Sequence, residues 1–235
     1  MKKLALVLAV GLALGAASAA LGEGLFTWKV RRGPVEIWQN SGAPYWWSFY
    51  NAAAEDTNGL GVLLQCPVVA ESTLVIGVSP IHVRNIQVTI CDDSGANNNG
   101  ISAADVTVTG TNSLGATITE VFDVTANTAA TIVGNKAFAS IASITIGQQD
   151  DTGAKVSLGV GNKIGAPFTF TARTSIFELV DSTPESTRPT YAGSATDIES
   201  CTYDFNTDPN GSRDYNVLMW IPPVSVVTAR TPAWH

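Results

Sequence analysis

Residues 83–126 read VRNIQVTICDDSGANNNGISAADVTVTGTNSLGATITEVFDVTA, and residues 133–165 read VGNKAFASIASITIGQQDDTGAKVSLGVGNKIG. Short runs of Val, Ile and Thr alternate in both segments with clusters of Gly, Asn, Asp and Ser. β-Branched residues favour strands, whereas the small and polar residues favour tight turns. The two segments therefore predict a series of antiparallel strands joined by turns.

The clearest hairpin joins Asp105–Thr111 to Ile118–Thr125 through a turn at Asn112–Gly115. Alternation along its first strand places Val106 and Val108 toward the core. A final hairpin is predicted near the C-terminus, with strands at 200–205 and 213–221 around a turn at 208–211. Further strands are expected at Val62–Leu64, Thr73–Val78, His82–Cys91, Thr131–Val133, Ala137–Phe138, Ser143–Ile146, Lys155–Leu158 and Phe168–Ala172. These elements predict an all-β fold, an antiparallel β-sandwich of the immunoglobulin-like or jelly-roll-like kind.

Shifts in composition divide the 235 residues into five parts. Residues 1–20 are apolar, and residues 21–60 form an aromatic-rich arm. Residues 61–173 hold the sandwich core, 174–199 form an extended connection, and 200–235 supply the final hairpin and a tail that complete the sandwich.

Residues 1–20 have the features of a secretory signal peptide. Lys2 and Lys3 precede an apolar run at Leu4–Leu14, and the small residues Ala17–Ala19 follow it. That run is too short to predict a stable membrane span. Two interpretations stay open: a leader that is cleaved on export, or an apolar helical arm that the working protein retains.

Aromatic residues crowd the segment that follows the apolar run. They are candidates for contacts with neighbouring subunits, because Trp and Tyr supply large contact areas at protein interfaces. Packing into one end of the sandwich core is the alternative, and a carbohydrate-binding platform is a third. The candidate interface residues are Phe26, Trp28, Trp38, Trp46, Trp47 and Tyr50.

Charge and composition argue against several classes of partner. The formal net charge is −7, and only 14% of residues are charged. Nucleic-acid binding requires a basic surface, and the one basic cluster, Lys29–Arg32, is short. We therefore expect no nucleic-acid partner.

Residues suited to catalysis or metal binding are few and badly spaced. The three cysteines, Cys66, Cys91 and Cys201, form no C-x-x-C pair, and the two histidines, His82 and His235, are far apart. Calcium loops need a closing Glu, which the Asp-rich segments at 92–100 and 206–211 lack, so these segments predict turns. We expect buried free thiols, with one disulfide of unassigned pairing as the alternative for a secreted protein. We expect no metal, no cofactor and no enzymatic activity.

Four parts of the central and C-terminal sequence resemble a known group. RNIQVT at residues 84–89 is followed by VTGTNSLGATITE at 108–120 and KAFASIASIT at 136–145, and PNGSRDY at 209–215 closes the pattern. The chain over roughly residues 60–221 resembles β-rich virion proteins of tailed bacteriophages. The resemblance implies a structural role in the virion, decorating or cementing the head shell, with no catalytic residues to transfer.

Three functional hypotheses follow. The first is a non-enzymatic virion protein, a homo-oligomer that binds capsid or neighbouring virion subunits through its arms. The second is an exported bacterial surface or filament protein, secreted after cleavage of its leader, whose edge strands pair between subunits. The third is a secreted carbohydrate-binding module or glycosidase that uses the exposed aromatics.

Overall fold

The structure is a computed structural model that describes residues 31–32, 35–36, 43–93, 99–150, 153–172 and 175–221. The chain forms two compact units, Met1–Ala43 and Pro44–His235. Within the first unit, β1 (Arg31–Arg32) pairs with β2 (Val35–Glu36) in antiparallel fashion. The predicted leader or arm at residues 1–20 lies outside the described residues, as does most of the aromatic segment before residue 43.

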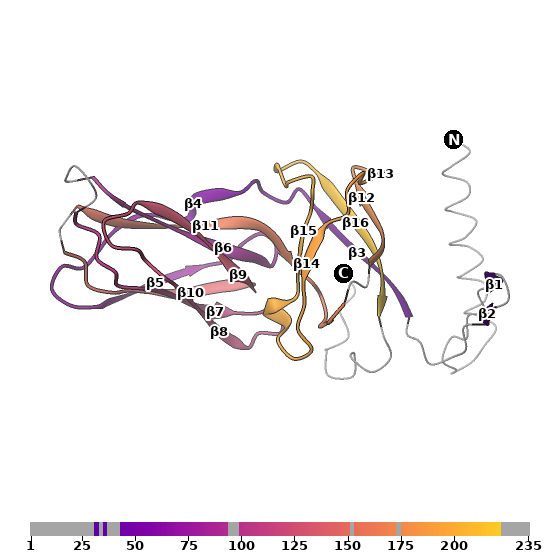
Figure 1. The fold of residues 1–235 in the computed structure, drawn as a ribbon, viewed down its shortest axis with the longest axis horizontal. Coiled ribbons are helices and arrows are strands. Elements are labelled where there is room, and N and C mark those ends of the chain that lie inside the picture. The colour runs from indigo at the N-terminus through magenta and orange to yellow at the C-terminus, as the bar shows by residue number, and fades with distance from the viewer. Residues whose placement is uncertain are drawn as a thin grey trace. The chain divides into compact units, whose positions relative to one another are not determined.

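The second unit is built almost wholly from antiparallel strands (Figure 1). One sheet has the order β5–β10–β7–β8, and another has the order β14–β15–β11–β6–β9, with β4 also paired to β11. The prediction of an all-β antiparallel sandwich is confirmed. The strands of these two sheets are β4 (Asp56–Gln65), β5 (Ser72–Val78), β6 (Arg84–Asp92), β7 (Val106–Thr111), β8 (Thr117–Phe122), β9 (Ala130–Phe138), β10 (Ser140–Ile146), β11 (Ala154–Gly165), β14 (Thr190–Ala192) and β15 (Thr202–Asp204).

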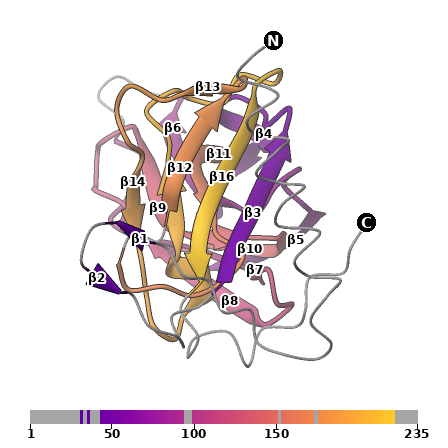
Figure 2. The ribbon, with the colours of Figure 1, turned by 90° about the vertical axis from the view of Figure 1, so that its right-hand side faces the viewer.

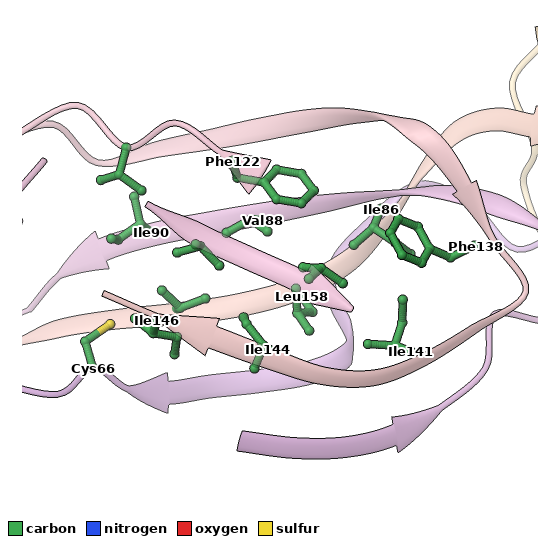
Figure 3. Close-up of a cluster of buried hydrophobic side chains, with 14 of the residues drawn as sticks. Cys66, Ile86, Val88, Ile90, Phe122, Phe138, Ile141, Ile144, Ile146 and Leu158 are labelled. Carbon is green, nitrogen blue, oxygen red and sulfur yellow. The ribbon is translucent and has the colours of Figure 1, made fainter. Parts of the chain in front are cut away.

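Apolar side chains from these two sheets meet in the first core cluster (Figure 3). Ile86 and Val88 of β6 and Leu158 of β11 approach from one sheet, and Ile141 and Ile144 of β10 approach from the other. Val106 and Val108 are fully buried in the same cluster, as predicted. Period-two alternation in strands places such residues on one face, and removal of that face from water drives the two sheets together.

A third sheet of four strands has the order β13–β12–β16–β3. Its strands are β3 (Ala43–Tyr50), β12 (Ser175–Val180), β13 (Thr183–Pro184) and β16 (Asp214–Ile221). Figure 2 shows β12, β16 and β3 side by side, with β16 running opposite to the other two. One face of this sheet packs into a second core cluster, to which β11 and β15 contribute Ile164 and Tyr203.

The predicted C-terminal hairpin is wrong. β15 pairs with β11 and β14, whereas β16 pairs with β12, so the two strands belong to different sheets. The turn between them does form: Asn210 Oδ1 accepts hydrogen bonds from the backbone N–H groups of Ser212 and Arg213, and Gly211 has φ +85°. A turn motif fixes a local reversal but not the partner of the strand that follows.

The segment 174–199 also differs from the expected extended connection, because it contains β12, β13, β14 and a 3-10 turn, η2 (Ile198–Ser200). Ser, Thr and Pro are frequent in its middle, but SIFELV at 175–180 is a strand that pairs along β16. Residues 43–60, assigned to the aromatic arm, contain β3 and the start of β4. No helix in the described part of the chain is long and apolar enough to span a membrane.

Candidate interaction surface

Strand β3 has the sequence APYWWSFY, in which aromatic residues occupy both faces. Tyr45, Trp47 and Phe49 point into the second core cluster. The alternate residues Trp46 and Tyr50 are about half exposed, at 50% and 54%. A strand that is aromatic on both faces thus anchors itself through one face and presents the other.

The inward face of β3 is held by ring contacts. Phe49 stacks on Tyr215 of β16 with ring centroids 4.8 Å apart and an interplanar angle of 8°. Trp47 lies 5.1 Å from Phe49 and 5.9 Å from Tyr203, centroid to centroid. Burial raises the pKa of the Tyr215 phenol to about 12, and its hydroxyl donates to the carbonyl of Thr207 at 2.8 Å.

The end of β3 is fixed by backbone contacts. Asn51 adopts φ 51°, in the left-handed region, and its N–H donates to the carbonyl of Arg213 at 3.1 Å. Nε2 of His82 lies 2.8 Å from the carbonyl oxygen of Tyr50. His82 therefore acts as a structural cap on the strand, and its ring packs against Phe49 at 5.7 Å.

The outward side chains of β3 continue across β16 and β12. Ser48 Oγ donates to Asn216 Oδ1 at 2.8 Å, which places these residues opposite each other. Asn51 and Arg213 follow the same antiparallel register, from which we infer that Trp46 lies opposite Leu218. Leu218 pairs in turn with Phe177 of β12, which is 46% exposed. We call this surface the aromatic face; its residues are Trp46, Ser48, Tyr50, Phe177, Asn216 and Leu218.

The aromatic face carries little charge. None of its six residues is an Asp, Glu, Lys, Arg or His, although Asp214 stands opposite Tyr50 at the start of β16. Glu178 of β12 is buried, and Ser175 Oγ donates to its carboxylate at 2.5 Å. A partner would therefore meet mainly aromatic, aliphatic and amide groups on this face.

The six candidate interface residues have different placements. Trp46 and Tyr50 lie together on the aromatic face, whereas Trp47 faces the second core cluster and is partly buried there. Phe26, Trp28 and Trp38 lie outside the described residues. Thus one face of β3 packs into a core, whereas the other is exposed, and its contact with a neighbouring subunit stays a prediction.

Sequence reasoning missed Phe177 and Leu218. Leu218 sits in a strand that was expected, but its neighbour β12 was not, so no shared face was foreseen. A register shift between Ser175 and Phe177 also breaks the simple alternation of β12. The apolar residues of SIFELV were the signal in the sequence from which strand β12 could have been predicted.

The free edge of the third sheet is β3, the terminal strand in the order of the described strands. In an antiparallel pair the N–H and C=O of one residue point to the same side, and successive residues alternate. Since the Asn51 N–H points to β16, the backbone groups of Phe49 and Trp47 do so as well. Those of Trp46, Ser48 and Tyr50 point away from the sheet.

A second set of polar groups lies buried where β6 meets β11. Arg84, only 1% exposed, donates to the carbonyls of Ala53, at 2.5 Å, and Gly161. Asn85 is also buried, and its Oδ1 accepts from the Lys163 N–H at 2.9 Å. These side chains supply hydrogen-bond partners to backbone groups where the register between β6 and β11 shifts, between Val160 and Ile164.

Burial lowers the pKa of Arg84 to about 10, with Tyr215 and Glu55 opposing the shift. Alternation along β6 predicts Asn85 and Gln87 on the face away from the first core, and they are nevertheless fully buried. Gln87 Nε2 donates to the carbonyls of Asp56, at 2.7 Å, and Val160, at 3.2 Å. The group joins strands, and we assign it a structural role.

Glu120 of β8 connects the two sheets of the sandwich. Its carboxylate accepts from the N–H groups of Asn135, at 2.6 Å, and Lys136, at 3.2 Å, in β9. Lys136 Nζ donates back to the carbonyl of Thr119 at 2.8 Å. Burial raises the pKa of Glu120 although the backbone hydrogen bonds lower it.

The three cysteines are all free thiols; Cys66 and Cys201 are buried as expected, whereas Cys91 is only half-buried. Burial raises the pKa of Cys66 to about 12, with the nearby Cys91 adding to the shift. A thiol of that pKa stays protonated and is a poor nucleophile at neutral pH. Among the described residues, no group of three or more His, Cys, Asp or Glu is placed to hold a metal ion.

Comparisons with family models, curated proteins and solved structures found no match for this chain.

Proposed function

We propose that this chain is a non-enzymatic structural subunit of a phage virion, which decorates or cements the capsid through contacts with neighbouring subunits. The observation that carries the proposal is the aromatic face at the free edge of a sheet. Clustered exposed aromatics with few charges are the composition of protein interface centres. The resemblance of residues 60–221 to β-rich virion proteins supports the same role.

The use of ionisable groups inside the fold supports a structural role. Arg84 and Glu120 hydrogen-bond backbone groups of neighbouring strands. Lys155 forms an ion pair with Asp93 across the start of β11. Each of these groups stabilises strand connections, and a rigid framework is what a decorating subunit requires.

The second candidate is an exported surface or filament-forming protein. A specific observation favours it: β5 is another terminal strand with no charged residue, and its Val75 is 87% exposed. Two distinct open edges on one subunit allow head-to-tail pairing, which builds open filaments. On this hypothesis residues 1–20 are removed during export.

Fractionation of the source organism tests the choice between the two. Assembled particles are separated on a density gradient, and their proteins are identified and N-terminally sequenced. A virion role predicts that the chain co-sediments with a shell protein and begins at Met1. A chain that begins at Ala20 and is recovered from the cell surface or medium would replace the virion proposal with the exported one.

A further inference from the structure

We propose that two copies of this chain associate through β3, whose free edges pair antiparallel about a two-fold axis beside Trp47, so that the two third sheets become one continuous sheet. The inference deepens the proposed function by naming a subunit contact, and it rests on that function for its biological meaning only. The partner is a second copy of the chain.

Backbone geometry selects the register. Trp46, Ser48 and Tyr50 present their N–H and C=O groups at the free edge, apart from the Tyr50 carbonyl, which His82 already contacts. Centring the axis at Trp47 sets Trp46 of one copy opposite Ser48 of the other, where they exchange two hydrogen bonds. The same register sets Tyr50 opposite Pro44.

This last pairing is complementary in an unusual way. Pro44 has no N–H to donate, and the carbonyl opposite it, that of Tyr50, is the one already engaged by His82. The Tyr50 N–H of one copy donates to the Pro44 carbonyl of the other. Every edge group from Pro44 to Tyr50 that needs a partner in this register has one.

Side chains fit the same arrangement. An isologous contact places the same patch on both copies, so an uncharged surface lets two chains of net charge −7 meet without placing like charges together. The sequence of β3 has no Asp, Glu, Lys or Arg. On the outer face the bulky Trp46 would lie beside the small Ser48 of the partner, and the aromatic face would run across both copies.

Four other strands at the ends of sheets, β13, β14, β8 and β5, are less suited to pairing. β13 is two residues long and ends in Pro184, and β14 has three residues. At β8, Lys136 Nζ donates a hydrogen bond to the Thr119 carbonyl. Charged side chains at a sheet edge oppose its pairing with another chain. β5 is uncharged, but Gly77 adopts φ +67°, which interrupts the extended backbone.

Sedimentation of the purified full-length chain over about a hundredfold range of concentration tests the inference. Ser48→Pro removes an N–H that points away from β16, so the parent sheet keeps its hydrogen bonds. Ser48→Ala is the matched control, because both variants lose the bond to Asn216. We expect dimers for the natural chain and for Ser48→Ala, and at least about a thirty-fold weaker dimer for Ser48→Pro, since two backbone hydrogen bonds are lost.

A second pair of variants guards against misfolding of Ser48→Pro. Trp46→Lys brings two lysines near each other across the axis, so we expect weaker association that salt partly restores. Val75→Lys places the same charge on the β5 edge and leaves the dimer unchanged. Dimers that survive Ser48→Pro and Trp46→Lys, or that Val75→Lys dissociates, would overturn the inference.

A natural chain that stays monomeric throughout would also overturn it. The particle fractionation described above is independent of this measurement. A monomer found in particles would refute the β3 dimer alone, whereas a β3 dimer absent from particles would refute the virion role alone.

Discussion

Arg84 is a long cationic side chain, fully buried, whose guanidinium donates hydrogen bonds to the main-chain carbonyls of Ala53 and Gly161. Carbonyl oxygens at a shift in strand register need donors, and a guanidinium offers several in a fixed plane. Alternation along RNIQVT predicted Arg84 on the same face as Ile86 and Val88, but it did not show which groups the guanidinium would bind. Its role depends on the irregular stretch of β11, almost eighty residues later in the chain.

Replacement of Arg84 tests that role. Arg84→Met keeps much of the volume but leaves the buried carbonyls of Ala53 and Gly161 without donors, so we expect a loss of about 2–5 kcal/mol in the free energy of unfolding. Arg188→Met, at an exposed arginine, should change it by less than about 0.5 kcal/mol. Chemical denaturation of both variants measures the difference; equal losses would contradict the structural role.

Glu120 makes stability depend on pH. Its folded-state pKa is raised above the ordinary value of 4.5, so the folded protein binds the proton more tightly than the unfolded chain does. The contribution of this tighter proton binding to the free energy of unfolding is fully present below pH 4.5, and it is lost as the pH rises through the folded-state pKa. A Glu120→Gln variant lacks this titration but keeps the other carboxyl groups, so their contribution to the pH dependence of stability is the same in both proteins.

We therefore expect the stability of the natural protein relative to Glu120→Gln to fall as the pH increases from below 4.5 to neutral. Urea unfolding at a series of pH values measures it. A relative stability that rises over this interval would mean that hydrogen bonds from Asn135 and Lys136 outweigh burial.

At the scale of elements, local alternation and turn chemistry predicted much of the sandwich. The hairpin of β7 and β8 was predicted with its turn, because the partner strands are adjacent in sequence and Asn112 Oδ1 accepts from the N–H groups of Leu114 and Ala116. The pairing of β16 with β12 was not predicted, since Val180 and its partner Tyr215 are 35 positions apart in the sequence. Sequence patterns identify strands more readily than long-range partners.

The interaction surface was predictable to a similar extent. Clustered aromatics pointed to residues 45–50, but whether they plug a core or face a partner depended on which face each side chain takes. Trp46 and Trp47 are adjacent in sequence and face opposite ways. That assignment requires the inward contact of Phe49 with Tyr215, which no local pattern reveals.

Neighbouring residues of β3 provide a direct test of this alternation. Phe49→Ala removes a buried ring stacked on Tyr215 and should destabilise the protein by about 3–5 kcal/mol. Tyr50→Ala removes a ring that is 54% exposed and should change the stability by less than about 0.5 kcal/mol. Denaturation midpoints of the two variants give the comparison. A larger loss of stability for Tyr50→Ala than for Phe49→Ala would mean that Tyr50, and not Phe49, faces the core.

On the scale of the second unit, Pro44–His235, two core clusters share strands. β11 contributes Val156 and Leu158 to the first cluster and Ile164 to the second. Arg84 reinforces the junction, because it binds a carbonyl of β11 and that of Ala53, next to Ala52 of the second cluster. Continuous strands of this kind couple the two clusters mechanically.

We accordingly expect this unit to unfold in one cooperative transition. Calorimetric and van't Hoff enthalpies should agree, and near-ultraviolet and far-ultraviolet circular dichroism should change together. If the near-ultraviolet signal of Trp47 were lost in a first transition and the far-ultraviolet signal of the strands in a second, the two clusters would be independent. Measurement below the concentration at which dimers form keeps association out of the comparison.

Assembly through β3 is the central claim for the whole molecule. Residue-resolved amide hydrogen exchange, at protein concentrations well above and well below the dimer midpoint, tests it most directly. The inward amides of Trp47 and Phe49 bond to β16, so they should exchange slowly at both concentrations. We predict that the outward amides of Trp46, Ser48 and Tyr50 exchange fast in the dilute protein and slowly in the concentrated protein. Outward amides that exchange at the same rate at both concentrations would contradict the claim.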